Sequence, residues 1–193
     1  MSNSVYLVLD MENDLVHVDG PHGKAAYGEQ ARARRIIENT RQALEKARAA
    51  GLRVGFVRVG FSPDYRECPA SSPIFSAARN NGVFKLGEWG TQVHPDLGQQ
   101  PGDFDIVKHR VSPFHGTHLD LILRTHGVRR IYCSGISTNA VIQAAMREGH
   151  DRDYEMVLLE DCCCALSAEE HDSSIRSLQR FGKITKSIEV VFE

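Results

Sequence analysis

The stretch that decides the fold lies close to the N-terminus, where residues 5–10 read Val-Tyr-Leu-Val-Leu-Asp. Five consecutive apolar residues leave no polar face, which is typical of a strand buried on both sides in a parallel sheet. Asp10 ends the run, so a carboxyl group stands at the carboxyl end of this strand. We therefore expect an α/β protein with this strand inside the sheet.

Helical and strand patterns alternate along the rest of the chain. Apolar residues recur at helical spacing from about residue 29 to residue 50, and Gly51 marks the end of that helix. Thr138 and Ser167 are suited to cap two later helices, the second with Glu170 at the capping-box position. We expect strands at residues 5–9, 53–59, 105–107, 130–134 and 155–159, with Ile184 and residues 190–192 finishing the sheet, and helices at residues 29–50, 117–126, 138–149 and 168–181. This alternation predicts a single domain over residues 1–193, with a Rossmann-like parallel β-sheet flanked by helices on both faces.

Length and charge exclude several classes of protein. The chain has 193 residues, and its 23 Lys and Arg against 25 Asp and Glu give a formal charge of −2. Such a balance argues against nucleic acid as a partner, since nucleic-acid binding needs a basic surface. No apolar run approaches the ~20 residues that cross a bilayer, and the first residues lack the pattern of a signal peptide. We expect a cytoplasmic protein without a membrane partner.

The stretch from residue 60 to residue 103 has no sustained periodicity and is rich in Gly, Pro, Ser and Asn. So long an irregular segment inside a compact domain is usually functional, as a lid or a binding loop. It also carries five large aromatic residues, namely Phe61, Tyr65, Phe75, Phe84 and Trp89. Exposed apolar surface of that kind marks an interface or a pocket lid. We expect this segment to help close a pocket and to take part in a homo-oligomer.

The five cysteines form no recognisable disulfide or metal pattern. Three are consecutive, Cys162, Cys163 and Cys164, and neighbouring residues of a strand point to opposite faces. We interpret them as small buried apolar side chains in a reducing compartment. A redox role for the triplet has little support in the sequence.

Two opposite charges stand at the ends of predicted strands. Ligands of such a sheet lie beyond the carboxyl ends of the strands, where Asp10 and Lys108 are both found. Considered alone, Asp10 is suited to cap the next turn, and Lys108 is suited to a solvent-exposed position at the edge of the sheet. Together they are a candidate acid–base pair directed at one crevice.

A glycine turn at residues 134–141 leads from a strand into a helix, with the sequence Ser-Gly-Ile-Ser-Thr-Asn-Ala-Val. Free N–H groups at a helix start favour negative charge, so the turn suits an oxyanion or a carboxylate. A cysteine in the first turn would be activated by the same field. The residues beyond the cap are Ala140, Val141 and Ile142, and none can act as a nucleophile.

Five motifs, in order along nearly the whole chain, resemble the isochorismatase-like (cysteine hydrolase) family. They are Leu9-Asp10-Met11-Glu12-Asn13-Asp14-Leu15, Val107-Lys108-His109-Arg110-Val111-Ser112-Pro113-Phe114, Gly116-Thr117-His118-Leu119-Asp120, Gly135-Ile136-Ser137-Thr138-Asn139 and Glu160-Asp161-Cys162. The resemblance implies a Rossmann-like α/β hydrolase, commonly a dimer or tetramer, that cleaves small amides with an Asp–Lys–Cys triad. The Asp matches Asp10, the Lys matches Lys108, and the Cys position falls on Val141.

The same resemblance implies a cis peptide bond between Ile136 and Ser137, which would direct the backbone N–H groups of Ser137 and Val141 at an oxyanion. It also matches Trp89-Gly90 to the substrate loop of the branch that lacks the cysteine. We expect Trp89 and Phe114 to line the substrate pocket.

Val141 cannot form a thioester, which favours the branch that cleaves a vinyl ether after protonation by the Asp. Direct attack of water on an amide, with Asp10 as base, and a ligand-binding or assembly module without catalysis remain alternatives. A small-molecule substrate is expected, and no cofactor or metal is implied. The segment after the second strand lacks the metal-binding histidine pattern of the nicotinamidase subgroup, and no phosphate-cradling G-x-G-x-x-G is present.

Overall fold

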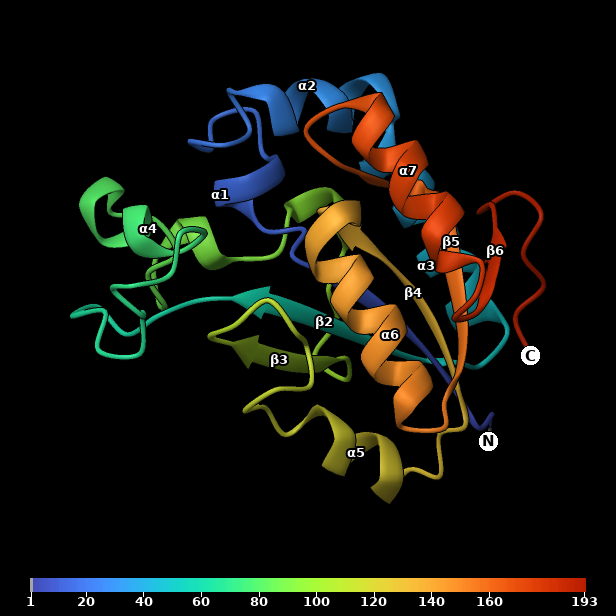
Figure 1. Cartoon of the computed structure of the whole chain (residues 1–193). Coiled ribbons are helices and arrows are strands. Elements are labelled where there is room, and N and C mark those ends of the chain that lie inside the picture. Colours follow the sequence, from blue (N-terminus) through green and yellow to red (C-terminus); the bar gives the residue numbers. More distant parts are fainter. Residues whose placement is uncertain (1) are drawn as a thin grey trace.

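The computed structural model describes residues 2–193 and contains a six-stranded parallel sheet in the order β3-β2-β1-β4-β5-β6 (Figure 1). The strands are β1 (Ser4–Leu9), β2 (Arg53–Val59), β3 (Phe104–Lys108), β4 (Arg130–Ile136), β5 (Glu155–Cys164) and β6 (Lys183–Thr185). β1 lies in the middle, where Val5 is in register with Arg53 of β2 and Ile131 of β4. The predicted parallel α/β fold is confirmed.

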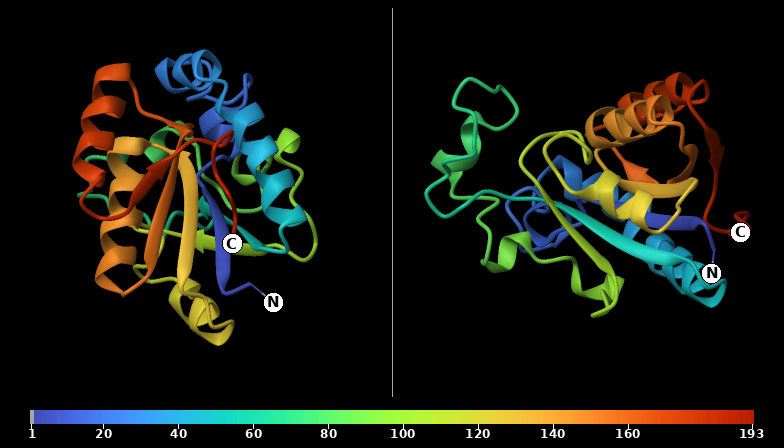
Figure 2. Two further views of the ribbon diagram at one scale, coloured as in Figure 1. Left: turned by 90° about the vertical axis from the view of Figure 1, so that its right-hand side faces the viewer. Right: turned by 90° about the horizontal axis from the view of Figure 1, so that it is seen from below.

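Helices cover both faces of the sheet (Figure 2). The helices of the chain are α1 (Asn13–Val16), α2 (Ala26–Ala33), α3 (Ile36–Ala49), α4 (Ser76–Asn81), α5 (Leu119–Thr125), α6 (Gln143–Asp151) and α7 (Ala168–Leu178). One apolar core lies under α2 and α3, and the other lies under α5, α6 and α7. β1 serves both cores, since Tyr6 and Val8 face the first and Leu7 and Leu9 face the second. Its unbroken apolar run follows from this double burial.

The predicted helix over residues 29–50 is wrong in one respect, because two helices occupy that region. α2 ends at Ala33, and Arg35 takes a left-handed conformation with φ 54° before α3 begins. The Arg34 side chain reaches β5 at this break, where its Nε donates to the Cys163 carbonyl at 2.8 Å. Contacts with a distant strand thus interrupt a sequence whose local pattern favours one continuous helix.

The C-terminal part of the sheet also differs from the prediction. Ile184 lies in β6, as expected, but residues 190–192 form no strand. The Phe192 ring packs instead against two aromatic rings, 5.7 Å from that of Tyr6 and 4.8 Å from that of Tyr132. The apolar Phe192 side chain, which contributed to the strand prediction, therefore packs against the core without forming a strand.

β5 runs five residues beyond its predicted end, from residue 159 to Cys164. The acidic residues inside this extension have partners, and Asp161 accepts hydrogen bonds from the Ser187 backbone N–H at 2.8 Å and hydroxyl at 2.6 Å. Cys162 and Cys164 face one core and Cys163 the other, all three as free thiols. The triplet thus consists of buried apolar side chains in a strand, as we predicted.

Residues 60–103 form little regular structure apart from α4 and the 3-10 turns η1 (Trp89–Thr91) and η2 (Pro95–Leu97). The inference that their aromatic residues form exposed surface is wrong for four of the five. Those four are buried within the chain itself, and they are Phe61, Tyr65, Phe75 and Phe84. Trp89 alone among them is exposed, at 45%. The homo-oligomer remains a prediction.

No helix among residues 2–193 combines the length and the apolar character needed to cross a bilayer.

Candidate active site

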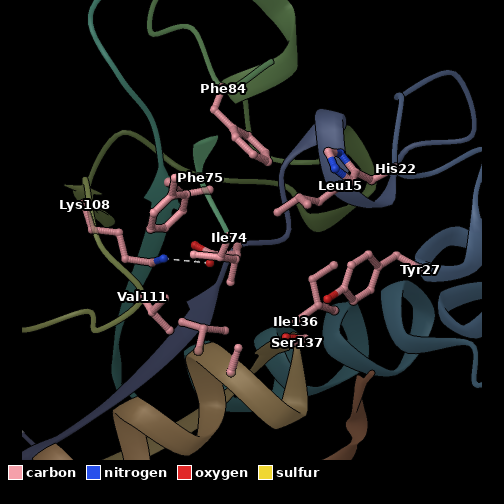
Figure 3. Close-up of a pocket in the computed structure, with 14 residues that line it drawn as sticks. Leu15, His22, Tyr27, Ile74, Phe75, Phe84, Lys108, Val111, Ile136 and Ser137 are labelled. Carbon is pink, nitrogen blue, oxygen red and sulfur yellow. Dashed lines mark ion pairs between the residues drawn. The ribbon is translucent and has the colours of Figure 1, made fainter. Parts of the chain in front are cut away.

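A cavity of about 200 Å³ opens at the carboxyl ends of β1, β2, β3 and β4 (Figure 3). Its lining consists of Asp10, Leu15, His22, Tyr27, Val59, Ile74, Phe75, Phe84, Lys108, Val111, Ile136, Ser137, Ala140 and Val141. Ligand sites of parallel α/β sheets are found at this edge. Four of the predicted site residues, Asp10, Lys108, Ser137 and Val141, meet here.

Asp10 and Lys108 form a buried ion pair on one side of the cavity. The Lys108 Nζ lies 2.8 Å from the Asp10 Oδ2, and the two residues are 1% and 6% exposed respectively. The ammonium also donates to the Arg110 carbonyl at 3.0 Å. The predicted contact between these charges is therefore confirmed. It follows from topology, because β1 and β3 flank β2 and end at the same edge.

The carboxyl group of Asp10 has one partnered and one free oxygen. Its Oδ1 is buried and has no hydrogen-bond partner within the described chain. Burial raises the pKa of Asp10, and the neighbouring Lys108 ammonium opposes that shift. Asp10 itself has φ 55°, and its backbone N–H donates to the Val57 carbonyl at 2.8 Å. The chain thus turns at Asp10 while staying attached to β2.

The glycine turn after β4 forms the other side of the cavity. The peptide bond between Ile136 and Ser137 is cis, as expected. Gly135 has φ 144°, and a Cβ built on it would lie 2.0 Å from the Leu9 carbonyl oxygen. Only glycine permits this approach of β4 to the end of β1. The turn therefore depends on contact between two strands far apart in the sequence.

The helix after this turn does not begin as predicted. Residues Thr138–Ile142 form a π-helical turn, η3, and α6 follows from Gln143. Thr138 is not the N-cap, because its hydroxyl pairs with Nδ1 of the buried His171 at 2.8 Å. The other ring nitrogen of His171 lies 2.9 Å from Arg34 Nη2 and 3.3 Å from a Glu160 oxygen. A tertiary network, rather than a local cap, holds the turn.

Val141 stands at the position that the resemblance assigns to the nucleophile. Its side chain is buried and lines the cavity. None of the five cysteines of residues 2–193 lines it, and Cys133 instead contacts the Met146 sulfur at 3.6 Å. Burial raises the pKa of the Cys133 and Cys164 thiols to about 12. The cavity therefore offers no thiolate.

Comparison with known proteins places this arrangement in a family. Residues 4–189 match the isochorismatase domain. The chain belongs to the isochorismatase family. That membership assigns the protein, at the coarse level, to the isochorismatase-type hydrolases.

Curated relatives of this isochorismatase-family chain include a ureidoacrylate amidohydrolase from Methylorubrum extorquens, 32% identical over 170 residues that cover 82% of this chain and 68% of the relative. An uncharacterised isochorismatase family protein of Escherichia coli O157:H7 is 32% identical over 190 residues, covering 96% and 92% of the two chains. Both span most of the motifs described above.

Solved structures of similar fold include an isochorismatase family protein from Desulfovibrio vulgaris, with a TM-score of 0.84 and 24% identity over 97% of this chain and 96% of that chain. N-carbamoylsarcosine amidase from Thermoplasma acidophilum has a TM-score of 0.74 and 24% identity, covering 97% and 98% of the two chains. At this identity the likeness concerns the fold.

Two residues predicted to line the pocket of this isochorismatase-family protein do not do so. Trp89 is turned outward, and its ring meets the His17 ring edge-on with the centroids 4.9 Å apart. Phe114 lies in the core below α5 and α6, where its ring stacks on that of Tyr154 at 6.2 Å. Each belongs to a stretch that carries the resemblance, but its side chain packs against other residues instead of lining the cavity.

No sequence pattern singled out His22 and Tyr27, which line the cavity, whereas Phe75 and Phe84 belong to the segment that was expected to help close a pocket. His22 lies in the tightly folded loop between α1 and α2, and Tyr27 lies in the first turn of α2. A Cβ on Gly28 would lie 1.7 Å from the carbonyl oxygen of Gly23, so the loop closes on itself only with glycine there. A local cluster of glycines was the one available signal, and it does not say where the loop lies.

Glu12 is a further residue that sequence reasoning did not single out. It is fully buried, and neither carboxyl oxygen has a hydrogen-bond partner among the described residues. Burial and then the nearby Asp10 carboxylate raise the pKa of Glu12 well above its usual range, while Lys108 and Arg58 oppose the shift. A buried carboxyl without a partner is far less costly when it is protonated.

The described residues include no group of three or more His, Cys, Asp or Glu side chains placed to hold a metal ion.

Proposed function

We propose that this protein hydrolyses a small molecule by acid–base chemistry at Asp10 and Lys108, without a covalent enzyme intermediate. The observation that carries the proposal is the combination of an intact buried Asp10–Lys108 pair with Val141 at the nucleophile position. Ser137, a hydroxyl residue in the cavity, lies near Tyr27 (Figure 3), and burial raises the pKa of the Tyr27 hydroxyl. A protonated phenol does not activate serine as a general base would.

The reaction we favour is hydrolysis of the vinyl-ether type. A proton from the Asp10 carboxyl forms a C–H bond at the alkene carbon, and the oxygen-bearing carbon becomes cationic. Water adds to that cation, and the resulting hemiketal breaks its C–O bond to give a carbonyl compound and an alcohol. Asp10 regains its proton from the added water. Burial raises the pKa of Asp10, and Lys108 stabilises the carboxylate that is left after transfer.

Hydrolysis of an amide by water is the alternative reaction, and the activities of the relatives support it. Ureidoacrylate amidohydrolase and N-carbamoylsarcosine amidase are both named for cleaving bonds of this kind. Here ionised Asp10 would take a proton from water, and the backbone N–H groups of Ser137 and Val141 would stabilise the oxyanion. The two reactions need opposite charge states of Asp10.

The rate as a function of pH separates these reactions. Acid catalysis by Asp10 should be lost as the pH rises through the pKa of that group, whereas base catalysis should appear over the same range. The assay panel comprises small vinyl ethers including isochorismate, amides and ureides. The measurement is the initial rate for each compound between pH 4 and pH 9, values taken to bracket the range in which carboxyl groups titrate.

Alkylation tests the absence of a nucleophile. Activity that survives complete reaction of accessible thiols with iodoacetamide supports the proposal. Loss of activity on alkylation of one of the five native cysteines would contradict it and would indicate a displaced nucleophile. A protein that binds members of the panel but turns over none of them would be a ligand-binding module, an interpretation that Val141 also favours.

A further inference from the structure

The cavity combines a neutralised charge pair with an apolar lining. Asp10 and Lys108 are its only lining residues of the Asp, Glu, Lys and Arg types among the described chain, and they compensate each other at 2.8 Å. Nine of the lining residues are apolar, and they are Leu15, Val59, Ile74, Phe75, Phe84, Val111, Ile136, Ala140 and Val141. A carboxylate bound among them would find no free guanidinium or ammonium group. Burying a charge without a partner costs several kcal/mol or more.

The remaining polar groups lie opposite this pair. Figure 3 shows Lys108 at one end of the cavity, with His22 and Tyr27 at the other. The His22 ring stacks on the Phe84 ring at 5.5 Å and 12°, and its Nδ1 is buried without a hydrogen-bond partner. The Tyr27 hydroxyl lies beside that of Ser137. A buried nitrogen without a partner in a cavity wall is suited to a hydrogen bond from or to a ligand.

The small size of the cavity limits what can occupy it. Its volume of about 200 Å³ is below the roughly 300–1,000 Å³ of sites for drug-sized ligands. In Figure 3, Phe84 and Phe75 lie on one side of this space and Ile136 on the other, so a ligand body must make mainly apolar contacts. Hydrogen-bonding groups lie at the two ends of the cavity, with Lys108 at one end and His22 and Tyr27 at the other, and the middle of a ligand would contact apolar side chains.

We propose that this site selects small uncharged molecules, with an apolar body and a carbonyl, amide or ether group that hydrogen-bonds, against carboxylates of the same shape. The inference rests on the proposed function for the location of the site, but it concerns binding and does not require turnover. Selection against the carboxylate arises from the cost of removing its hydration where no counter-charge is free. The apolar body contributes affinity through burial against the aromatic rings.

Titration calorimetry with matched probes tests this selection at pH 7.5. Isobutyramide and isobutyrate share shape and size, and isobutylamine supplies the cationic counterpart. We expect the amide to bind at least tenfold more tightly than either charged probe. Equal or tighter binding of isobutyrate would overturn the inference, and so would the absence of binding by all three probes.

A variant at the mouth of the cavity sharpens the test. Ile74 is 57% exposed, so Ile74→Arg adds a guanidinium at the rim without disturbing the core. It should raise the ratio of isobutyrate affinity to isobutyramide affinity about tenfold. Ile188→Arg is the matched control, since Ile188 is 73% exposed and lies outside this cavity. An equal gain in the control would show a general charge effect and would count against selection by the cavity.

The binding result and the catalytic proposal can fail separately. Selective binding of the amide with no hydrolysis of any panel compound supports the inference and contradicts the proposed function. Hydrolysis of a carboxylate substrate at rates equal to those of its neutral analogue would support the proposed function and contradict the inference on selectivity.

Discussion

The two sides of the cavity differ in what they bring to it. On the side of β1 and β3, Asp10 and Lys108 form a charged pair that is almost completely removed from solvent. On the side of the turn after β4, Ile136, Ala140 and Val141 present apolar side chains. The first side can donate or accept a proton, and the second has backbone N–H groups and the Ser137 hydroxyl but no cysteine. Proton chemistry and nucleophilic chemistry are therefore separate properties of this fold.

The two sides also respond differently to substitution. A buried ion pair is stable only as a pair, because either partner alone is a charge in an apolar environment. Position 141 is constrained by volume, and side chains of similar size are tolerated there. Variants on the charged side should therefore change both activity and stability, whereas variants at Val141 should change chemistry alone.

Asp10→Asn should have the largest effect on activity. The variant removes the ionisable group, and loss of a general acid or base lowers the rate by about 10²–10⁴-fold. Initial rates on any substrate found in the panel measure this loss, at a temperature where circular dichroism shows the variant to be folded. Asp161→Asn is the matched control, because Asp161 bonds to Ser187 outside the cavity. Activity of Asp10→Asn within threefold of the wild type would remove Asp10 from the mechanism.

Lys108→Met should destabilise the fold by about 3–5 kcal/mol, since it leaves the Asp10 carboxyl buried without its partner. The pKa of Asp10 should rise further when the ammonium is removed. Folded protein then holds that proton more tightly than the unfolded chain, so stability is retained at low pH and lost as the pH rises through the folded-state pKa. Urea unfolding at pH 5 and pH 8 measures the difference.

The control for this prediction is Lys46→Met. Lys46 is exposed, and its ammonium donates to the Ser187 carbonyl at 2.8 Å, so its loss should cost less than about 1 kcal/mol. A similarly small loss of unfolding free energy for Lys108→Met would mean that the buried pair contributes little to stability. The two sides of the cavity would then tolerate substitution equally well.

Glu12→Gln should have an intermediate effect that depends on pH. Burial raises the pKa of Glu12, so the folded state binds this proton more tightly than the unfolded state. The stabilising contribution is complete below the unfolded-state pKa and disappears as the pH rises through the folded-state pKa, by up to about 1.4 kcal/mol per pH unit. The variant lacks this titration and should become more stable than the wild type as the pH rises.

Unfolding free energies between pH 4 and pH 9 measure the difference between Glu12→Gln and the wild type. Glu38→Gln is a suitable control, because Glu38 is exposed and pairs only with Arg35 at 2.9 Å. A difference between Glu12→Gln and wild type that stays constant over the whole range would show that Glu12 is ionised in the folded protein.

Val141→Cys should have the smallest effect on stability, less than about 1.5 kcal/mol, because the two side chains are close in volume. In a Cys68→Ser background the remaining native thiols are buried, so rapid alkylation reports the new thiol. If the apolar side of the cavity lacks only its nucleophile, the variant should also gain amide or ester hydrolysis. Alkylation without new turnover would indicate a site adapted to chemistry without a nucleophile.

The sequence by itself determined the sheet and the charged pair. The apolar run before Asp10 requires burial on both faces, and the carboxyl ends of parallel strands lie at one edge of the sheet, so Asp10 and Lys108 were both expected at that edge. The resemblance to the isochorismatase-like family placed the nucleophile position on Val141, where the sequence has no reactive side chain. These features are either local patterns or direct consequences of strand order.

Only the tertiary structure decided the break at Arg34 and Arg35, the place of Phe192 and the true lining of the cavity. Arg34 leaves its helix for a carbonyl on β5, and Trp89 and Phe114 turn to other partners. His22 reaches the cavity through a loop closed by glycine contacts. These contacts do not show up in the hydrophobic periodicity of the sequence. The free energy of packing outweighs the local preference of the chain for a helix or a strand.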